Sequence, residues 1–148
     1  MIPSRKFQEF LDLGIVKKQT PNKERANSLI KESEGKKHFL MIALKNIPKK
    51  EINPNFVVDS CYDIFMELIR AKMFLDGFNA GNSHEAEISY AETLGFKEQE
   101  IRFMNSIRYY RNGTRYYGSI LSEEFAKSVF DFLNIIYPKL ITLVKKIK

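Results

Sequence analysis

Residues 55–76 carry apolar side chains on two adjacent stripes at helical spacing, and no other feature limits the fold of this chain as strongly. A helix that is apolar along two stripes must be covered on both sides, so it lies at the centre of a bundle. We therefore expect a central helix over about 55–76. The stripes are Val57, Cys61, Ile64, Leu68, Ala71 and Leu75 on one side and Val58, Tyr62, Phe65, Ile69 and Met73 on the other.

The other segments also show helical apolar spacing, none alternates with period 2, and turn residues separate them. Residues 1–21 are expected to form a short helix and an extension. Asn82 and Glu85 have capping-box spacing at the start of the short helix. The polar middle of the first long helix, KESEGKK, predicts a surface segment or a bend. We expect these helices over about 22–46, 83–95, 97 to the Asn-Gly at 112–113, and 122 to the C-terminus, the last kinked at Pro138.

These elements predict an all-α fold, an antiparallel bundle of four or five helices that forms a single domain over 1–148. The terminal helix is apolar on two faces, which in a chain of 148 residues suggests burial against a second subunit. We therefore expect a homodimer.

Composition excludes several classes of protein. Apolar residues make up 44% and charged residues 28%, as in a soluble globular domain, and no apolar run approaches the roughly 18 residues of a membrane span. The N-terminus does not resemble a signal peptide, and the single Cys61 cannot form an intrachain disulfide. We expect a cytoplasmic protein without membrane contact. The net charge of +6 permits an anionic partner, although dispersed lysines also keep a surface soluble.

Metal and cofactor chemistry lack the residues they need. No phosphate-binding glycine loop occurs, and HEAEI at 84–88 has Ile88 where a zinc motif has its second His. With two His and one Cys, a zinc site would need carboxylates from several helices. We expect neither a metal nor a cofactor. His84 stands at a predicted helix N-terminus, where the dipole disfavours its cation, so a neutral, hydrogen-bonded His is expected.

The stretch IRYYRNGTRYYGS, residues 107–119, has the composition of a binding surface. On a helix its three arginines fall within roughly 60° of each other, and guanidinium groups suit phosphates. The interleaved tyrosines can stack on unpaired bases. Pairing of the arginines with Asp59, Asp63 and Glu67 is an equally open alternative. The residues concerned are Arg108, Arg111 and Arg115, with Tyr109, Tyr110, Tyr116 and Tyr117.

The polar stripe beside them, Asp59, Asp63, Glu67 and Arg70, has two interpretations of its own. It is the solvated edge of the central helix, or it is an acidic cluster for a metal.

A late-helix Arg-Asn followed by an aromatic residue, and then a long terminal helix, resembles the HEPN superfamily of nucleotide-binding and RNase domains over roughly 22–148. The blocks that carry the resemblance are CYDIFMELIRAKMFLDGFNA, SHEAEISYAETLGF and IRYYRNGTRYYG. The resemblance implies a dimer whose paired motifs line a shared cleft. Arg111 matches the motif Arg, and Asn112 matches the polar residue after it.

In active members the motif Arg and a His cleave RNA without metal, but here Tyr116 occupies the His position of the R-x4-H spacing and Tyr117 the next. Tyrosine, with an ordinary pKa near 10, is a poor general base. In a regular helix Arg111 and Tyr116 also point about 140° apart. A shared site would need a break at Gly113 or a cleft across a dimer.

The resemblance therefore implies a binding module that holds RNA or a nucleotide around Arg111 and Asn112 without cleavage, with Arg108, Arg115, Tyr117 and His84 as further contacts. One alternative is a metal-independent, toxin-like endoribonuclease that uses Tyr116 or His84 in place of the missing His. Another is an interaction partner of a minimal nucleotidyltransferase in a toxin–antitoxin-like pair.

Overall fold

The computed structural model describes residues 5–145 and confirms the all-α class. The only strands in this range are β1 (Lys17–Lys18) and β2 (Phe78–Asn79), which pair antiparallel. None of its helices is both long and apolar enough to cross a membrane. The helices are α1 (Phe7–Asp12), α2 (Lys23–Asn46), α3 (Pro54–Asp76), α4 (His84–Thr93), α5 (Glu98–Tyr117) and α6 (Glu123–Lys145), with a 3-10 turn at Lys49–Glu51.

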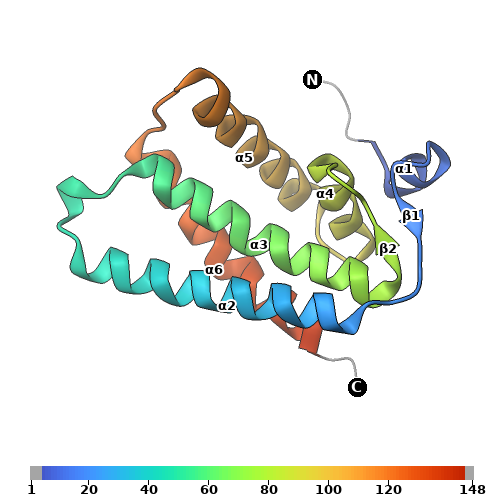
Figure 1. Cartoon of the computed structure of the whole chain (residues 1–148). Coiled ribbons are helices and arrows are strands. Elements are labelled where there is room, and N and C mark those ends of the chain that lie inside the picture. The colour runs from blue at the N-terminus through green and yellow to red at the C-terminus, as the bar shows by residue number, and fades with distance from the viewer. Residues whose placement is uncertain (1–4, 146–148) are drawn as a thin grey trace.

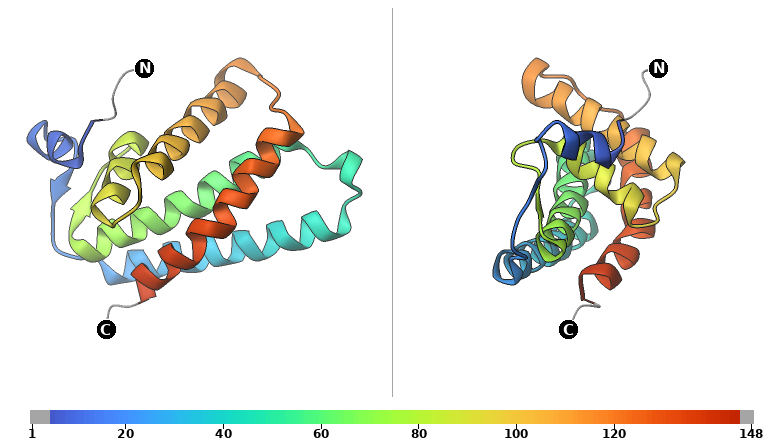
Figure 2. Two further views of the ribbon diagram at one scale, coloured as in Figure 1. Left: turned by 180° about the vertical axis from the view of Figure 1, so that it is seen from behind. Right: turned by 90° about the vertical axis from the view of Figure 1, so that its right-hand side faces the viewer.

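The central position predicted for residues 55–76 is confirmed, because α3 lies between α2 and α5 while α6 crosses behind it (Figures 1 and 2). Asn53 caps its start, and Pro54 follows at the first helical position, where its missing N–H is harmless. Both apolar stripes are buried except for Leu75, which is partly buried, and each fully buried large side chain contributes about 1.5–3 kcal/mol. The side chains with no exposure include Cys61, Tyr62, Ile64, Phe65, Leu68 and Ile69.

α3 ends at Gly77, where only glycine fits. Its φ is +85°, and a Cβ here would lie 2.7 Å from the carbonyl oxygen of Gln19, in the segment that leads from β1 to α2. Gly77 therefore lets the N-terminal segment pass close to the end of α3.

Two local expectations need correction. The polar middle of α2 is not simply a surface segment, because Ser33 is fully buried and its hydroxyl donates to the carbonyl oxygen of Ile64 at 2.8 Å. A small polar residue thus fits where α2 meets α3. At α4 the cap is Ser83, not Asn82, and its hydroxyl accepts from the backbone N–H of Ala86.

The break predicted at the Asn-Gly of 112–113 is wrong, because α5 continues to Tyr117 and Gly118 caps it with a φ of +68°. A glycine inside a helix costs only about 1 kcal/mol relative to alanine. Side-chain contacts from the last turns of α5 to α3 offset that cost.

Both apolar faces of α6 pack within the chain. Val129, Leu133 and Ile136 are fully buried, and Phe130 and Ile141 pack at the margin of the same core. The helix runs through Pro138 without interruption. The apolar character of α6, which suggested a second subunit, is thus accounted for by the bundle itself.

The N-terminal segment packs at the far end of α3 from α5's last turn (Figure 1). Phe7 packs against Phe78 and Tyr90, with ring centroids 5.2 and 4.8 Å away. β1 pairs with β2 in the turn that leads from α3 to α4. The N-terminal segment thereby fixes the turn that precedes His84.

Candidate nucleic-acid interface

The three arginines of residues 107–119 share one side of α5, and two of them contact acids of α3. Arg111 donates from Nε to Asp59 Oδ1 at 2.9 Å, and its Nη2 lies 3.6 Å from Asp63 Oδ1. Arg115 Nη2 lies 3.3 Å from Asp59. The alternative in which these arginines pair with the polar stripe is confirmed for Asp59 and Asp63. Arg108 has a weaker contact, a 3.4 Å hydrogen bond from Nε to Asn105.

Glu67, the third acid proposed as a partner, pairs with a different helix. Its Oε2 accepts from Lys36 Nζ of α2 at 2.6 Å. Burial raises the pKa of Glu67, and the bond from Lys36 opposes that shift. The polar stripe of α3 is therefore bridged to α5 at Asp59 and to α2 at Glu67.

Tyr62 joins Arg111 to His84. The guanidinium carbon of Arg111 lies 5.0 Å from the centroid of the Tyr62 ring, within range of a cation–π contact. The Tyr62 hydroxyl shares a 2.9 Å hydrogen bond with Nδ1 of His84. Arg111 and His84, which are 27 positions apart in the sequence, thus contact the ring and the hydroxyl group of one buried tyrosine.

Burial favours the neutral forms of His84 and Tyr62. It lowers the pKa of His84, and the positive charges of Arg70, Arg111 and Arg108 lower it further, against an opposing effect of Glu87. Burial likewise raises the pKa of Tyr62, although Arg111 opposes the shift. The neutral state predicted for His84 is supported. Desolvation is the main cause, whereas the sequence pointed to the helix dipole.

The tyrosines of this stretch extend into solvent. Tyr117 is 84% exposed, Tyr116 75% and Tyr109 71%, whereas Tyr110 packs its ring 5.0 Å from that of Phe125. Because α5 is unbroken, Tyr116 projects away from Arg111, and the structure does not bring the two together within one chain. Asn112 is half-buried beside Arg111.

A further ion pair, which the sequence did not indicate, lies two turns from Asp63 along α3. Arg70 donates from Nε and Nη2 to the two carboxylate oxygens of Glu87 at 2.5 and 2.9 Å. The Glu87 side chain is only 2% exposed. A buried carboxylate with both oxygens bonded to one guanidinium is a strong, geometrically specific pair. It joins α3 to α4 one turn from His84.

The acidic residues do not form a metal site. Within residues 5–145 no three His, Cys, Asp or Glu side chains are placed to hold a metal ion. Asp59 and Asp63 are instead occupied by Arg111. The metal interpretation of the polar stripe therefore has no geometric support.

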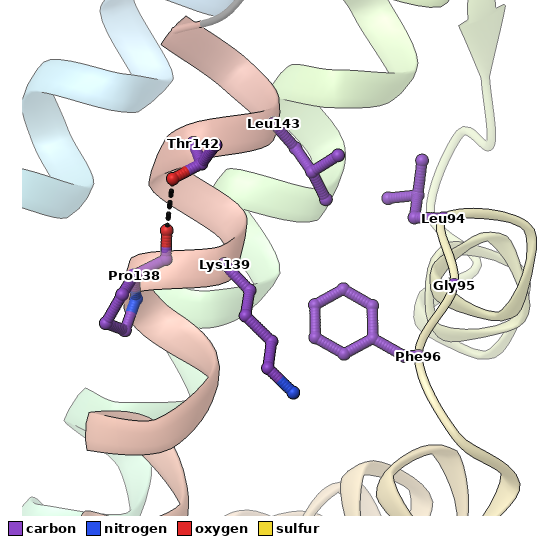
Figure 3. Close-up of a pocket in the computed structure, with 7 residues that line it drawn as sticks. All are labelled: Leu94, Gly95, Phe96, Pro138, Lys139, Thr142 and Leu143. Carbon is purple, nitrogen blue, oxygen red and sulfur yellow. Dashed lines mark hydrogen bonds between the residues drawn. The ribbon is translucent and has the colours of Figure 1, made fainter.

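A pocket of about 460 Å³ between the α4–α5 turn and α6 has a different character. Its walls are mainly apolar, with Leu94 and Phe96 facing Leu143 across the opening, and Lys139 also lines it (Figure 3). The Thr142 hydroxyl donates to the carbonyl oxygen of Pro138. None of the predicted site residues lines it. The candidate site thus remains the arginine-bearing side of α5 and the neighbouring face of α3.

Comparison with known proteins adds no family assignment, because no family model, curated protein or solved structure gives a significant match to the chain.

Proposed function

We propose that this protein is an HEPN-like binding module that holds RNA or a nucleotide around Arg111 and Asn112 without cleaving it. Its contact surface, which we call the arginine–tyrosine surface, extends along the second half of α5. The surface wraps around the helix: Arg108, Arg111 and Arg115 lie on the side next to α3, and Tyr109, Tyr116 and Tyr117 lie on its solvent-exposed sides. The observation that carries the proposal is the exposure of three tyrosines, 71–84%, beside arginines from the same helix.

Exposed aromatic rings and arginines have complementary uses for a single strand. Each ring can stack on an unpaired base whatever its identity, and each guanidinium can donate to a phosphate. Arg115 is half exposed and its contacts to Asp59 are long, 3.3 Å each, so a phosphate can compete for it. Asp59 keeps the arginines oriented when no ligand is bound.

The proposal of binding without cleavage follows from the position of Tyr116. General base catalysis requires a group within hydrogen-bond reach of the 2′-hydroxyl near the motif arginine. Tyr116 lies on another side of α5 from Arg111, and tyrosine is a weak base at neutral pH.

The first prediction concerns Arg115. Replacing Arg115 with Ala should weaken binding of a short single-stranded RNA by roughly tenfold, the scale of one charge-assisted hydrogen bond. Native binding should itself fall by roughly 20-fold between about 50 and 200 mM salt if all three arginines contact phosphates. Fluorescence anisotropy with labelled RNA measures both effects.

Lys127→Ala is the matched control, because it removes one positive charge from an exposed site on α6. It should change the affinity by less than about twofold. Equal losses from the two variants, or binding that does not respond to salt, would contradict the proposed surface.

A second candidate function is a metal-independent endoribonuclease, and the contact between Tyr62 and His84 favours it. A neutral imidazole can accept a proton. His84 bonds to the hydroxyl of Tyr62, whose ring contacts Arg111. The same RNA incubated in EDTA distinguishes the two functions. Cleavage that is lost in both His84→Ala and Arg111→Ala, with binding retained in His84→Ala, would establish the enzyme in place of the binding module.

The homodimer is the second prediction. Ile120 lies just after the end of α5 and, at 85%, is the most exposed large apolar side chain within residues 5–145. We expect two copies to associate through this end of α5, which would place two arginine–tyrosine surfaces beside each other. Light scattering at increasing protein concentration should show a dimer, and Ile120→Asp should shift it towards the monomer.

Substitutions on α6 are unsuitable for this test, because Phe130 and Ile141 pack within the bundle. Replacing either residue with Asp would destabilise the fold and would not test the dimer interface. A native protein that stays monomeric at every concentration tested would contradict the dimer.

A further inference from the structure

A polar pocket of about 320 Å³ lies on the α4 side of α3, next to His84. It is bounded by the first turn of α2, the last turns of α3, the turn that contains β2, and the start of α4. These segments meet at one end of the bundle, away from the last turn of α5 (Figure 1). The lining residues that matter below are Arg25, Arg70, Phe74, Asn79, Asn82 and His84.

The lining of this pocket includes two guanidinium groups, those of Arg25 and Arg70, and one carboxylate, that of Glu87. Arg25 lies over the ring of Phe74, 4.6 Å from its centroid, and its guanidinium makes no ion pair or hydrogen bond to another residue of 5–145. Arg70 is held by Glu87 through Nε and Nη2, which leaves Nη1 without a hydrogen bond in the same range. The pocket therefore has an excess of positive charge and free guanidinium donors.

Neutral donors complete the lining. The Asn79 amide is oriented because its Oδ1 accepts from the backbone N–H of Gly81 at 2.8 Å, while its Nδ2 makes only a long 3.4 Å bond to Gln19. The Asn82 side chain makes no hydrogen bond within the described part of the chain. His84 uses Nδ1 for Tyr62, so Nε2 is the ring nitrogen that remains available. A ligand with several acceptor oxygens and negative charge matches these donors.

We propose that this pocket binds a terminal phosphate monoester, either at the end of an RNA strand or on a free nucleotide. A monoester carries close to two negative charges and three outer oxygens, which two arginines can share, whereas an internal diester carries one charge. The volume suits a single small ligand. His84, which lines the pocket, bonds to Tyr62, and Tyr62 contacts Arg111 of the arginine–tyrosine surface. The inference thus rests on the proposed function and specifies its ligand.

The test compares one RNA sequence with a 5′-phosphate, a 3′-phosphate or hydroxyl groups at both ends. One of the phosphorylated strands should bind the native protein about tenfold more tightly than the hydroxyl strand. Arg25→Gln should reduce that difference to less than about twofold. Arg25 has no ion pair to lose within residues 5–145, so this variant should fold normally. Lys23→Gln, a similar exposed charge at the start of α2 outside the pocket, should preserve the full difference.

Adenosine monophosphate distinguishes the source of the phosphate. Competition by the nucleotide against the phosphorylated strand, lost in Arg25→Gln, supports a pocket open to both ligands. Nucleotide binding that depends on Arg25, without any effect of RNA ends, assigns the pocket to free nucleotides. Absence of both effects overturns the inference.

The inference can fail while the proposed function stands. Salt-dependent RNA binding that requires Arg115 but ignores terminal phosphates, together with no nucleotide binding through Arg25, would leave the arginine–tyrosine surface intact and refute the pocket. Conversely, nucleotide binding through Arg25 without any RNA binding would support the pocket and refute the surface.

Discussion

Replacing Arg70 with Ala should lower the free energy of unfolding by about 3 kcal/mol, because it leaves the buried Glu87 carboxylate without its partner. Both oxygens of Glu87 bond to Arg70, and its side chain is 2% exposed. We expect the lower end of the range for broken buried pairs because Arg70 is 27% exposed and water can enter where it is removed. Urea denaturation followed by circular dichroism measures the change.

Two further variants make this test specific. Arg102→Ala breaks the exposed pair with Glu98 on α5 and should cost less than about 0.5 kcal/mol. Arg70→Met combined with Glu87→Leu should recover most of the loss, because no charge then remains buried. A cost for Arg70→Ala no greater than that for Arg102→Ala would show that Glu87 is not isolated as described.

Replacing Asp59 with Asn should strengthen RNA binding by about five- to tenfold, whereas Arg111→Ala should weaken it by at least tenfold. Asp59 contacts both Arg111 and Arg115, so its carboxylate competes with a phosphate for the same guanidinium groups. The Asn side chain keeps an acceptor oxygen for Arg111 but removes the negative charge. The two variants therefore change the affinity in opposite directions, as anisotropy titrations at one salt concentration would show.

Asp131→Asn provides the control for Asp59→Asn. It removes an exposed acid of α6 whose partner is Lys127, and it changes the net charge by the same amount. A similar gain from both variants would indicate a general charge effect. Weaker binding in Asp59→Asn would mean that Asp59 positions the arginines in the complex and does not compete with the ligand.

The sequence was most informative where one pattern extended over many residues. The two stripes of 55–76 predicted both the existence and the central position of α3, because a helix buried on two sides has apolar residues at helical spacing on both sides. The Asn-Gly at 112–113 was a short signal, and tertiary contacts overrode it: Arg111 and Arg115 pair with Asp59 and hold the end of α5 helical. β1 and β2, with two residues each, are too short for any periodicity.

The residues that each helix contributes to the candidate site could be predicted from the sequence, but the contacts between the helices could not. Arginines at 108, 111 and 115 share a side of α5 because helical geometry is local, and acids on α3 were available to pair with them. The hydrogen bond from Tyr62 to His84 depends on how the turn after α3 folds back, and nothing local specifies that. Tyr62 was assigned to the core, and its hydroxyl within an apolar stripe was the only hint of a polar contact.

The buried apolar residues within 5–145 form two separate clusters that should resist opening unequally. Phe7, Phe10, Val16 and Tyr90 form a small cluster of their own around the turn, apart from the main core on α3. Small peripheral clusters open locally at a lower free energy than the whole fold. The order of the turn before His84 therefore depends on the N-terminal segment. Release of that segment would loosen the pocket beside His84 while the helical bundle stays folded.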